Sequence, residues 1–257
     1  MKDKVLETLY EKKGEYVHIN NLASRLEIPV SEVHEHVTSL KNEGYIIETS
    51  SDEEFMLKED LTLLLPHKLK DKLSTDYIGK EIHYFREVDS TNEVAKKLAR
   101  EGAPEGTIVI AESQRRGKGR RGKKWISPLG GAWLSIILRP NTLPINAPQL
   151  TFIAGVAAAQ TIKEEYGLDA GIKWPNDVLI DDKKVCGVLT EISTEIDTID
   201  YIVTGIGIDA NIDVNLLPSE LQDTTTSLKS ELNQDISRMI LVQKFLGNFE
   251  AMYDEFN

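Results

Sequence analysis

One short segment of this chain concentrates side chains that bind anions. Residues 115–124 carry seven cations, namely Arg115, Arg116, Lys118, Arg120, Arg121, Lys123 and Lys124. The glycines among them, Gly117, Gly119 and Gly122, let the backbone approach a ligand and permit positive φ. The 257-residue chain has a formal net charge of −12, so a merely solvated run of charge is the weaker alternative. We predict a local site that encloses an anion such as phosphate and that is mobile when empty.

Two further motifs could supply polar groups to the same site. In "DSTNE", residues 89–93, Ser90 and Glu93 have the spacing of a capping box, and such a helix start also offers free donors to a ligand. In "KWPND", residues 173–177, Pro175 favours an extended residue before it, and a turn follows. Lys173 is then either an exposed turn residue or a cation fixed at the sheet edge, and the spacing leaves both interpretations open.

The composition disfavours several other chemistries. The single cysteine, Cys186, excludes an internal disulfide, fits a reducing cytoplasm and is expected to be a buried strand residue rather than a nucleophile. No histidines pair at helical spacing, so no metal site is expected, and neither a Walker loop nor a G-x-S-x-G elbow occurs. The N-terminal residues do not resemble a signal peptide, and no apolar run approaches the ~20 residues of a membrane span. An acidic chain has little general affinity for nucleic acid or membranes, so anions must bind locally.

The N-terminal part has the pattern of a small helical unit. Apolar spacing predicts three helices, over residues 2–13, 18–29 and 30–45. Ser31 is the expected cap of the third helix, and Gly44 its expected end. Residues 45–57 then predict two short strands around a polar turn. Because two helices with a tight joint and a hairpin indicate a winged helix-turn-helix, we assign residues 1–65 to a DNA-binding-type domain and residues 66–80 to a linker.

From residue 81 onward, strands and helices alternate. Strands are expected over residues 81–88, 106–113, 131–140, 171–174, 178–192 and 201–211. Helices are expected over residues 90–102, 148–167 and 238–256. The longest strand segment should be a hairpin that turns at Asp181 and Asp182, whereas residues 212–228 have the poor periodicity of a loop. We therefore predict that residues 81–257 form an α+β domain on a mixed sheet.

In combination, the motifs resemble those of the biotin–protein ligases. The family's order and spacing are shared by "DSTN", "GKGRRGKKW", "KWPND", "KVCGVLTE" and "GIGID", and the likeness covers nearly the whole chain. It is closest to the bifunctional kind, which is also the biotin operon repressor. The resemblance implies a class II synthetase-like catalytic domain after the winged helix. The SH3-like barrel that commonly follows in the family is expected to be absent, because the chain stops at Asn257.

The resemblance implies a reaction that uses biotin, ATP and Mg²⁺. The biotin carboxylate attacks the α-phosphate of ATP to give biotinyl-5′-adenylate and pyrophosphate, and the biotinyl group then passes to a lysine of a biotin carboxyl carrier protein. Cations and amides would reduce the repulsion between the two reacting anions, and a loop that orders over the adenylate would exclude water. Further implications are a cytoplasmic protein, a homodimer when the adenylate is bound, and operator DNA as a second partner.

Residue by residue, the resemblance also implies a set of ligand contacts. Biotin contacts are expected from Ser90, Thr91, Asn92, Gln114, Lys118, Gly119, Arg120 and Lys173. Nucleotide contacts are expected from Trp125, Asn176 and Asp209. Lys173, at the reacting carboxylate and phosphate, and Arg120 are the expected catalytic residues, and no residue is expected to form a separate metal site. Residues 212–228 match a loop that orders over the adenylate.

Two motifs and the DNA-binding half depart from the family pattern. Lys118 replaces an arginine and keeps the charge without the planar fork, and Asp209 replaces an asparagine and cannot donate as an amide does. The expected recognition helix carries Glu32, Glu35 and Glu43, and the wing reads "TSSDEEF", so binding to DNA phosphates should be weak or absent. The prediction is a ligase. The alternatives are a ligand-sensing regulator with weakened ligase activity and, less favoured, a lipoyl ligase, whose glycine-rich arginine–serine motif has no counterpart here.

Overall fold

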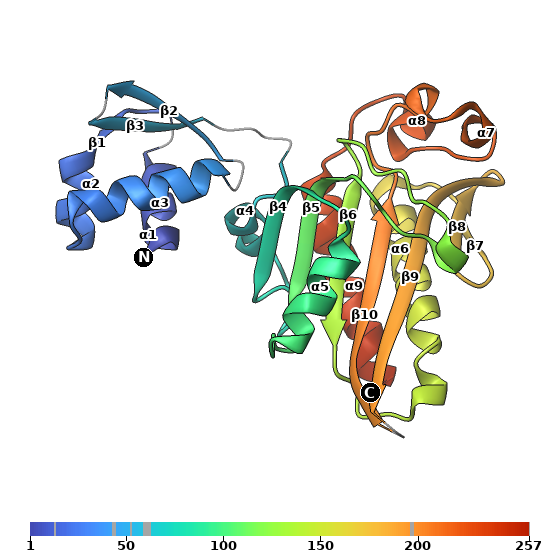
Figure 1. Cartoon of the computed structure of the whole chain (residues 1–257). Coiled ribbons are helices and arrows are strands. Elements are labelled where there is room, and N and C mark those ends of the chain that lie inside the picture. Colours follow the sequence, from blue (N-terminus) through green and yellow to red (C-terminus); the bar gives the residue numbers. More distant parts are fainter. Residues whose placement is uncertain (13, 43–44, 52, 59–62, 196–197, 257) are drawn as a thin grey trace. The chain divides into compact units, whose positions relative to one another are not determined.

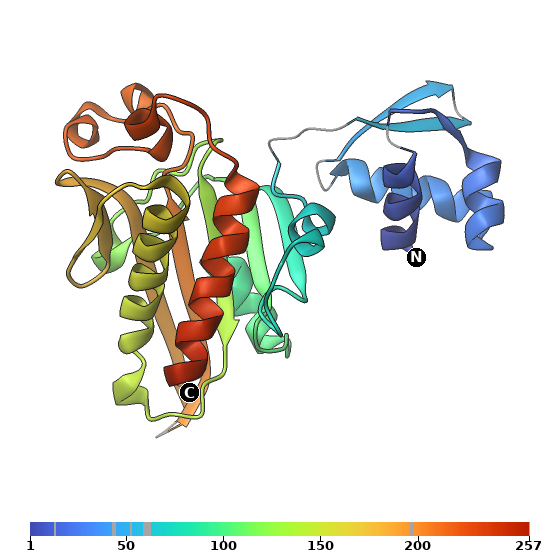
Figure 2. The same cartoon turned by 180° about the vertical axis from the view of Figure 1, so that it is seen from behind.

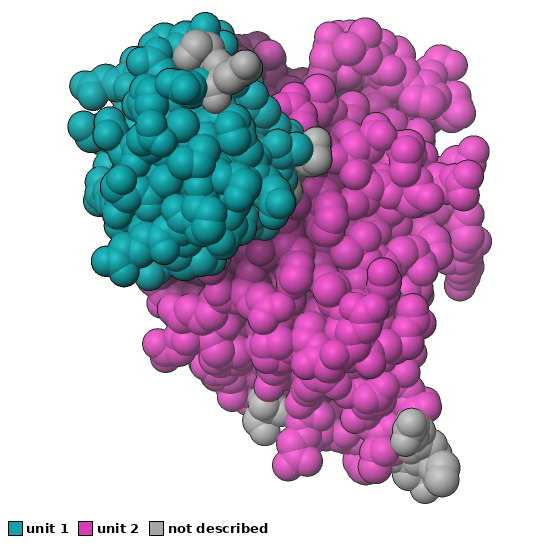
Figure 3. Space-filling model, turned by 60° about the vertical axis from the view of Figure 1, so that its left-hand side comes forward, with its two compact units in different colours: residues 1–61 teal, residues 62–257 magenta. Residues whose placement is uncertain are grey.

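The computed structural model describes residues 1–257 except 13, 43–44, 52, 59–62, 196–197 and 257. The chain divides into two compact units, residues 1–61 and residues 62–257, which are teal and magenta in Figure 3. The boundary falls before the expected domain end at residue 65, so the described residues 63–65 belong to the second unit. Among the described residues, no helix is both long and apolar enough to cross a membrane.

The first unit packs three helices against a small antiparallel sheet (Figure 1). Its elements are α1 (Lys2–Glu11), β1 (Val17–His18), α2 (Ile19–Leu26), α3 (Val30–Asn42), β2 (Ile46–Ser51) and β3 (Glu54–Lys58). The central strand is β3, which pairs with both β1 and β2. The core consists of side chains at most 3% exposed, including Val5, Leu9, Leu22, Val33, Leu40 and Phe55. The three helices and the hairpin that the apolar spacing predicts are therefore present.

The third helix begins two residues earlier than its expected cap, Ser31, implies. It starts at Val30, and the N–H groups of Glu32 and Val33 donate to the carbonyl of Pro29. Ser31 therefore lies inside the first turn and is not the cap that the sequence suggested. The expected end of this helix, Gly44, lies outside the described residues.

The second unit is built on a seven-stranded mixed sheet of order β4-β5-β6-β10-β9-β8-β7. Its strands are β4 (Ile82–Val88), β5 (Ile108–Gln114), β6 (Ala132–Leu138), β7 (Ala170–Lys173), β8 (Asp177–Ile180), β9 (Lys183–Glu195) and β10 (Thr198–Ile208). Among these described strands, β4 and β5 are parallel and the other neighbours are antiparallel. This confirms the predicted α+β class and mixed sheet. The β8–β9 hairpin turns at Asp181 and Asp182, as predicted, with φ values of 45° and 65°.

Helices cover both faces of this sheet. Figures 1 and 2 show α5 (Thr91–Arg100) on one face, with α6 (Gln149–Tyr166) and α9 (Arg238–Phe256) on the other. Small side chains at Ala95 and Ala99 let α5 pack on Val109 and Val203. The strands β4 and β5 are parallel, and α5 connects them. The start of α5 therefore lies beside the carboxyl ends of both strands. The "DSTN" motif and the start of the basic segment are therefore brought together by topology.

The segment expected to be a linker is fixed onto the second unit. It contains α4 (Pro66–Asp71), and Gln243 on α9 donates to the carbonyl of Leu69 at the end of this helix (3.0 Å). Farther along, the carboxylate of Glu250 on α9 accepts hydrogen bonds from the backbone N–H groups of residues 76–78 at 2.5–3.1 Å. Glu250 is only 6% exposed. Residues 66–80 are thus held on the second unit and are not a separate connector.

The segment after β10 is more ordered than the sequence predicts. It contains the short helices η3 (Val214–Leu216), α7 (Ser219–Gln222) and α8 (Leu228–Leu232). Ile212 and Leu217 pack on the buried ring of Trp133. These helices have at most five residues, which is too short to produce the helical periodicity that the sequence analysis sought.

Candidate functional site

A cavity of about 470 Å³ opens where α5 begins, β5 ends and the basic loop, residues 115–124, folds back over the sheet. Strands β8–β10 and residues from the 212–228 segment complete its walls. Ten of the eleven residues expected to bind ligand line it, namely Ser90, Thr91, Asn92, Gln114, Lys118, Gly119, Arg120, Trp125, Asn176 and Asp209. The eleventh, Lys173, does not.

The start of α5 is capped from the neighbouring strand. Gln114 Oε1 accepts a hydrogen bond from the Thr91 backbone N–H (2.8 Å), and Gln114 Nε2 donates to Ser127 Oγ (2.8 Å). Ser90 makes no capping hydrogen bond, so the capping box predicted for Ser90 and Glu93 is wrong. The reason is that the sheet register places Gln114 beside the end of β4, where it reaches the first turn. Ser90 Oγ is buried in the cavity wall and has no hydrogen-bond partner among the described residues.

Asn92 is held in one orientation by contacts to both ends of its amide. Its Nδ2 donates to Glu191 Oε2 (2.9 Å) and to the carbonyl of Leu189 (3.2 Å). Its Oδ1 accepts from Ser135 Oγ (2.6 Å). Gly205 makes the room for this side chain, because a Cβ at that position would lie 2.1 Å from Asn92 Oδ1. The cavity wall therefore presents a pre-oriented amide.

The basic loop is folded back on itself. The backbone N–H of Trp125 donates to the Gly117 carbonyl (2.8 Å). A Cβ at Gly117 would lie only 2.4 Å from the backbone carbonyl oxygen of Trp125. Positive φ occurs at Gly122 (74°) and at the neighbouring Arg121 (55°) but not at Gly117 or Gly119. Gly117 therefore allows the backbone at residue 117 to lie close to the Trp125 carbonyl. Of the three glycines, only Gly122 has the predicted positive φ.

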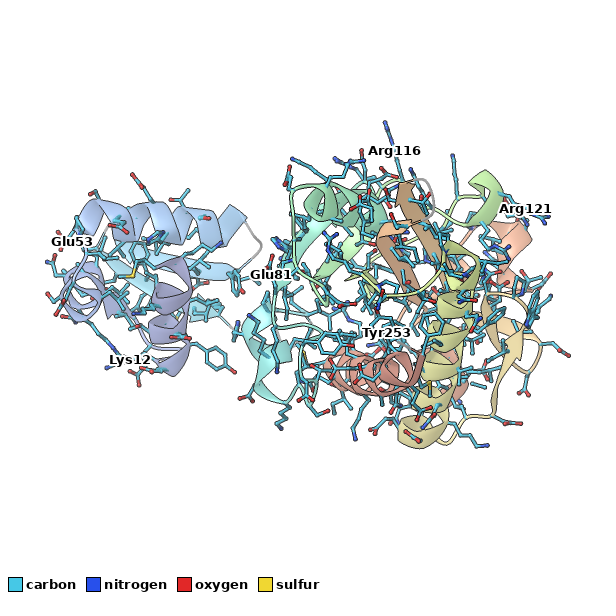
Figure 4. All side chains as sticks on the ribbon, turned by 90° about the horizontal axis from the view of Figure 1, so that it is seen from below. Lys12, Glu53, Glu81, Arg116, Arg121 and Tyr253 are labelled. Atoms are coloured by element: carbon cyan, nitrogen blue, oxygen red, sulfur yellow. The ribbon has the colours of Figure 1, made fainter. Side chains whose placement is uncertain are left out.

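Some cations of the basic loop are paired and others are not. Lys118 Nζ donates to the Glu93 carboxylate, and Arg120 Nη1 donates to Asn176 Oδ1 (3.0 Å). In the described part of the chain, no carboxylate lies within ion-pair distance of three cavity cations, Arg121, Lys123 and Lys124. Figure 4 shows two loop side chains extending away from the unit, Arg116 and Arg121. Positive charge thus remains available to an anion in the cavity.

The structure brings Lys184, and not the expected Lys173, into the cavity. Lys173 is exposed at the end of the edge strand β7. Lys184 lies on β9, with its Nζ 2.6 Å from Asp177 Oδ1 and 4.8 Å from the centre of the Trp125 ring. Lys184 is therefore the fixed cation of this cavity wall, while the catalytic role expected of Lys173 stays a prediction.

A β-bulge explains why regular alternation misses Lys184. The register between β8 and β9 shifts so that Val185 is an extra residue on β9. Lys184 and Gly187 are three positions apart, and strict alternation would turn them to opposite faces. Because of the bulge they share one face, and Lys184 Cε lies 3.1 Å from the place that a Cβ on Gly187 would occupy.

The Trp125 ring is admitted by glycines on two adjacent strands. A Cβ at Gly207 would lie 2.6 Å from Trp125 Nε1, and one at Gly187 would lie 2.8 Å from the ring. Trp133 meets the ring edge-on, with 6.2 Å between the ring centres. Trp125 Nε1 is buried and has no hydrogen-bond partner among the described residues. The indole forms an aromatic wall of the cavity beside Lys184.

Asp209 is a buried carboxyl in the same wall. Its side chain is 3% exposed, and burial raises the pKa of this carboxyl well above its ordinary value, while the charge of Lys184 acts in the opposite direction. A protonated carboxyl donates one hydrogen bond and accepts another, as an amide does. The replacement of the family's asparagine is therefore compatible with the same kind of contact.

The structure also places the lone cysteine and the potential metal ligands. Cys186 is fully buried, and burial raises the pKa of its thiol, which confirms the predicted inert strand residue. Over the described ranges, no group of three or more His, Cys, Asp or Glu side chains is placed to hold a metal ion.

Known proteins share this sequence and arrangement. The model of the Biotin/lipoate A/B protein ligase family matches residues 84–209. The chain is 35% identical over 253 residues to the bifunctional ligase/repressor BirA of Bacillus subtilis (strain 168), which covers 98% of this chain and 78% of that protein. It is 30% identical over 197 residues to the protein of the same name from Escherichia coli (strain K12), which covers 76% of this chain and 60% of that protein.

A solved structure agrees with these sequence comparisons. The biotin protein ligase from Aquifex aeolicus in complex with biotin and ATP matches with a TM-score of 0.61 and 33% sequence identity. The match covers 69% of this chain and 72% of that chain. Sequence and fold therefore point to the same group of proteins.

Proposed function

Because this chain belongs to the biotin–protein ligase family, we propose that it activates biotin with ATP and transfers the biotinyl group to a lysine of a biotin carboxyl carrier protein. The observation that carries the proposal is that the start of α5, the basic loop and Lys184 converge on one cavity from distant parts of the sequence. Biotin and MgATP are the proposed substrates, and the cytoplasm is the proposed location.

The first step would join two anions, which explains the charge of the cavity. A carboxylate oxygen of biotin forms a bond to the α-phosphorus of ATP while the bond to pyrophosphate breaks. Lys184 and Arg120, on different walls, would reduce the repulsion between these groups and stabilise the charge that develops. Lys184 takes the role that the sequence analysis gave to Lys173.

The cavity wall at the start of α5 suits the neutral, polar ring of biotin. Ser90 Oγ is buried without a partner among the described residues, and the Asn92 amide is fixed. A ligand with both donors and acceptors satisfies such groups at little reorganisation cost. We assign the nucleotide to the part of the cavity where Trp125, Asn176 and Asp209 line the wall.

In the second step, biotinyl-adenylate must react with the acceptor lysine before water hydrolyses it. The basic loop and the 212–228 segment both border the cavity and are the proposed covers. The attacking amine displaces AMP and forms an amide with the biotinyl carbonyl carbon.

The test measures each step separately. The protein, biotin, Mg²⁺ and ATP should release pyrophosphate, and an added carrier domain should gain the mass of one biotinyl group. Lipoate in place of biotin is the control for the lipoyl alternative. If calorimetry detects biotin binding but no pyrophosphate appears above background, the ligand-sensing regulator replaces the ligase.

We further propose that the first unit is a winged helix-turn-helix with weak affinity for DNA. In that arrangement α3 enters the major groove and the β2–β3 hairpin is the wing. Exposed Glu35 on α3 and Glu53 beside the hairpin oppose phosphate binding. The one lysine of α3, Lys41, donates to Thr49 Oγ1 (2.9 Å). A homodimer formed on adenylate binding would present two such units and raise the affinity.

A further inference from the structure

One acidic side chain beside the cavity has no role in the chemistry above. Glu93 follows Asn92 in the first turn of α5. Its Oε1 accepts from Lys118 Nζ of the basic loop and lies 2.6 Å from Lys96 Nζ on the next turn. Glu93 does not line the cavity, whereas Lys118 and Asn92 do. Glu93 and Lys118 are 41% and 48% exposed, so the pair lies at the rim.

The contact between Glu93 and Lys118 belongs to a longer network. Lys96 Nζ also donates to Glu191 Oε1 (2.9 Å), and Glu191 Oε2 accepts from the Asn92 amide (2.9 Å). Charge-assisted hydrogen bonds thus run without a break from the loop to a residue of the cavity wall. The bonds from Lys118 and then from Lys96 lower the pKa of Glu93, so its carboxylate is ionised at neutral pH.

The loop is attached at its base by backbone hydrogen bonds and by ion pairs of Arg115 with Asp89 (2.9 Å) and Glu87 (3.6 Å), and at its tip by side chains. At the base, the N–H groups of Arg115 and Arg116 donate to carbonyls at the end of β4 (2.9 and 2.8 Å). At the tip, Lys118 reaches α5 and Arg120 reaches Asn176 between β7 and β8. The tip is therefore held to two different walls of the cavity, and the attachment to α5 is an ion pair.

We propose that Glu93 is a positioning residue that clamps the basic loop over the cavity by holding Lys118 against α5. The inference rests on the proposed function, because the purpose of the clamp is to retain the activated ligand. The ion pair also offsets part of the repulsion among the loop cations. The alternative is that the ion pair with Glu93 keeps Lys118 from contacting the ligand. In that case, replacing Glu93 would tighten ligand binding.

The first test needs no ligand, so it remains informative if the proposed function fails. Trypsin cleaves after lysine and arginine, and the seven cations of the loop are cleavage sites. We expect Glu93→Gln to be cleaved within residues 115–124 about twofold to fivefold faster than wild type, the effect of losing one partly exposed ion pair. In about 1 M NaCl the difference should vanish, because salt screens the pair in the wild type.

The matched control is Glu101→Gln at the C-terminal cap of the same helix. Glu101 pairs with Lys97 at 3.9 Å, both side chains are exposed, and the pair does not involve the loop. This variant should be cleaved at the wild-type rate, and circular dichroism should show that all three proteins are folded. Equal cleavage of Glu93→Gln and Glu101→Gln would overturn the clamp.

The second test measures how long the activated ligand stays bound. Preformed biotinyl-adenylate should dissociate about twofold to fivefold faster from Glu93→Gln than from wild type, again the size of one partly exposed ion pair. The maximal rate of pyrophosphate release should stay near wild type, because Glu93 does not touch the reacting atoms. Slower dissociation would overturn the clamp in favour of the alternative, in which the ion pair keeps Lys118 from contacting the ligand. If wild type forms no adenylate while its loop is protected from trypsin, the proposed function fails and the loop contact stands.

Discussion

In the first unit Arg25 lies 2.6 Å from Glu11, with the side chains 50% and 56% exposed. In the second unit Arg238 lies 2.8 Å from Glu112, with the side chains 5% and 1% exposed. In the surface pair, water solvates each separate charge about as well as the partner does, so the ion pair adds little to the stability of the first unit. In the buried pair, removal of either side chain leaves the other charge buried without a partner and without water, which lowers the stability of the fold.

The buried pair also connects segments that lie far apart in the sequence. Arg238, at the start of α9, donates to the carbonyl of Gly131 before β6 (2.8 Å), and Glu112 on β5 accepts the N–H of Leu64 (2.8 Å). The second unit therefore uses internal charge to fix the strands that carry its site. The first unit is held by an apolar core, so its surface charges contribute little to its stability.

The largest expected effect is on stability, and it compares the loss of the buried pair with the loss of the surface pair. Arg238→Met should lower the free energy of unfolding of the second unit by about 3–5 kcal/mol, because the Glu112 carboxylate stays buried without a cation. Arg25→Met should cost the first unit less than about 1 kcal/mol. Urea unfolding followed by tryptophan fluorescence isolates the second unit, since it contains all three tryptophans, Trp125, Trp133 and Trp174.

The control for that comparison removes both charges of the buried pair. The double variant Glu112→Gln, Arg238→Met should regain part of the loss, because no unpaired charge remains. Circular dichroism at 222 nm follows both units and gives the value for Arg25→Met. A loss below about 1 kcal/mol for Arg238→Met would show that the buried pair matters no more than a surface pair.

The next effect concerns the two lysines that compete for one role. Lys184→Ala should reduce the rate of pyrophosphate release about 10²–10³-fold at saturating biotin and ATP, the usual loss for one preorganised electrostatic contact. Lys173→Ala should keep a rate near wild type, because this side chain is exposed on β7 and outside the cavity. The opposite ranking would mean that the sequence-based assignment was right and that the reacting groups lie elsewhere.

The smallest effect tests whether surface charge alone limits the first unit. Glu35→Lys on α3 should raise affinity for a labelled DNA duplex roughly threefold at low salt and make the salt dependence steeper by about one unit of log–log slope. Fluorescence anisotropy with biotin, Mg²⁺ and ATP present measures both quantities. Glu7→Lys on α1 makes the same change of charge on another helix and is the matched control. Equal gains from the two variants would contradict a specific role of α3 in binding DNA.

Local sequence patterns predicted the elements well. Helix α9 runs over Arg238–Phe256, as its apolar spacing indicated, and the hairpin turns at Asp181 and Asp182. Both features depend on neighbours within a few residues, so the sequence contains the information that fixes them. The same holds for the anionic preference of the basic loop, which follows from the charge of the segment itself.

Features that depend on distant partners were missed. The cap of α5 comes from Gln114, which is 23 residues from Thr91, and Glu93 turns to Lys118, which is 25 residues away. A capping box is a reasonable prediction from spacing, but the spacing contains no information about a strand that arrives beside the helix. Likewise, residues 66–80 have the composition of a connector and become clamped only because Glu250 lies opposite them.

By itself, the sequence determined that this protein has an α+β catalytic unit, a glycine-bearing anion loop, and motifs that resemble those of the biotin–protein ligases. Only the tertiary structure decided which lysine lines the cavity. "KWPND" places Lys173 before a rigid turn and made it the natural choice, yet an extra residue at Val185 turns Lys184 toward Trp125 instead. The direction of a strand side chain depends on how the strand pairs with its neighbour, and a bulge that inserts one residue into this pairing reverses the alternation that the sequence predicts.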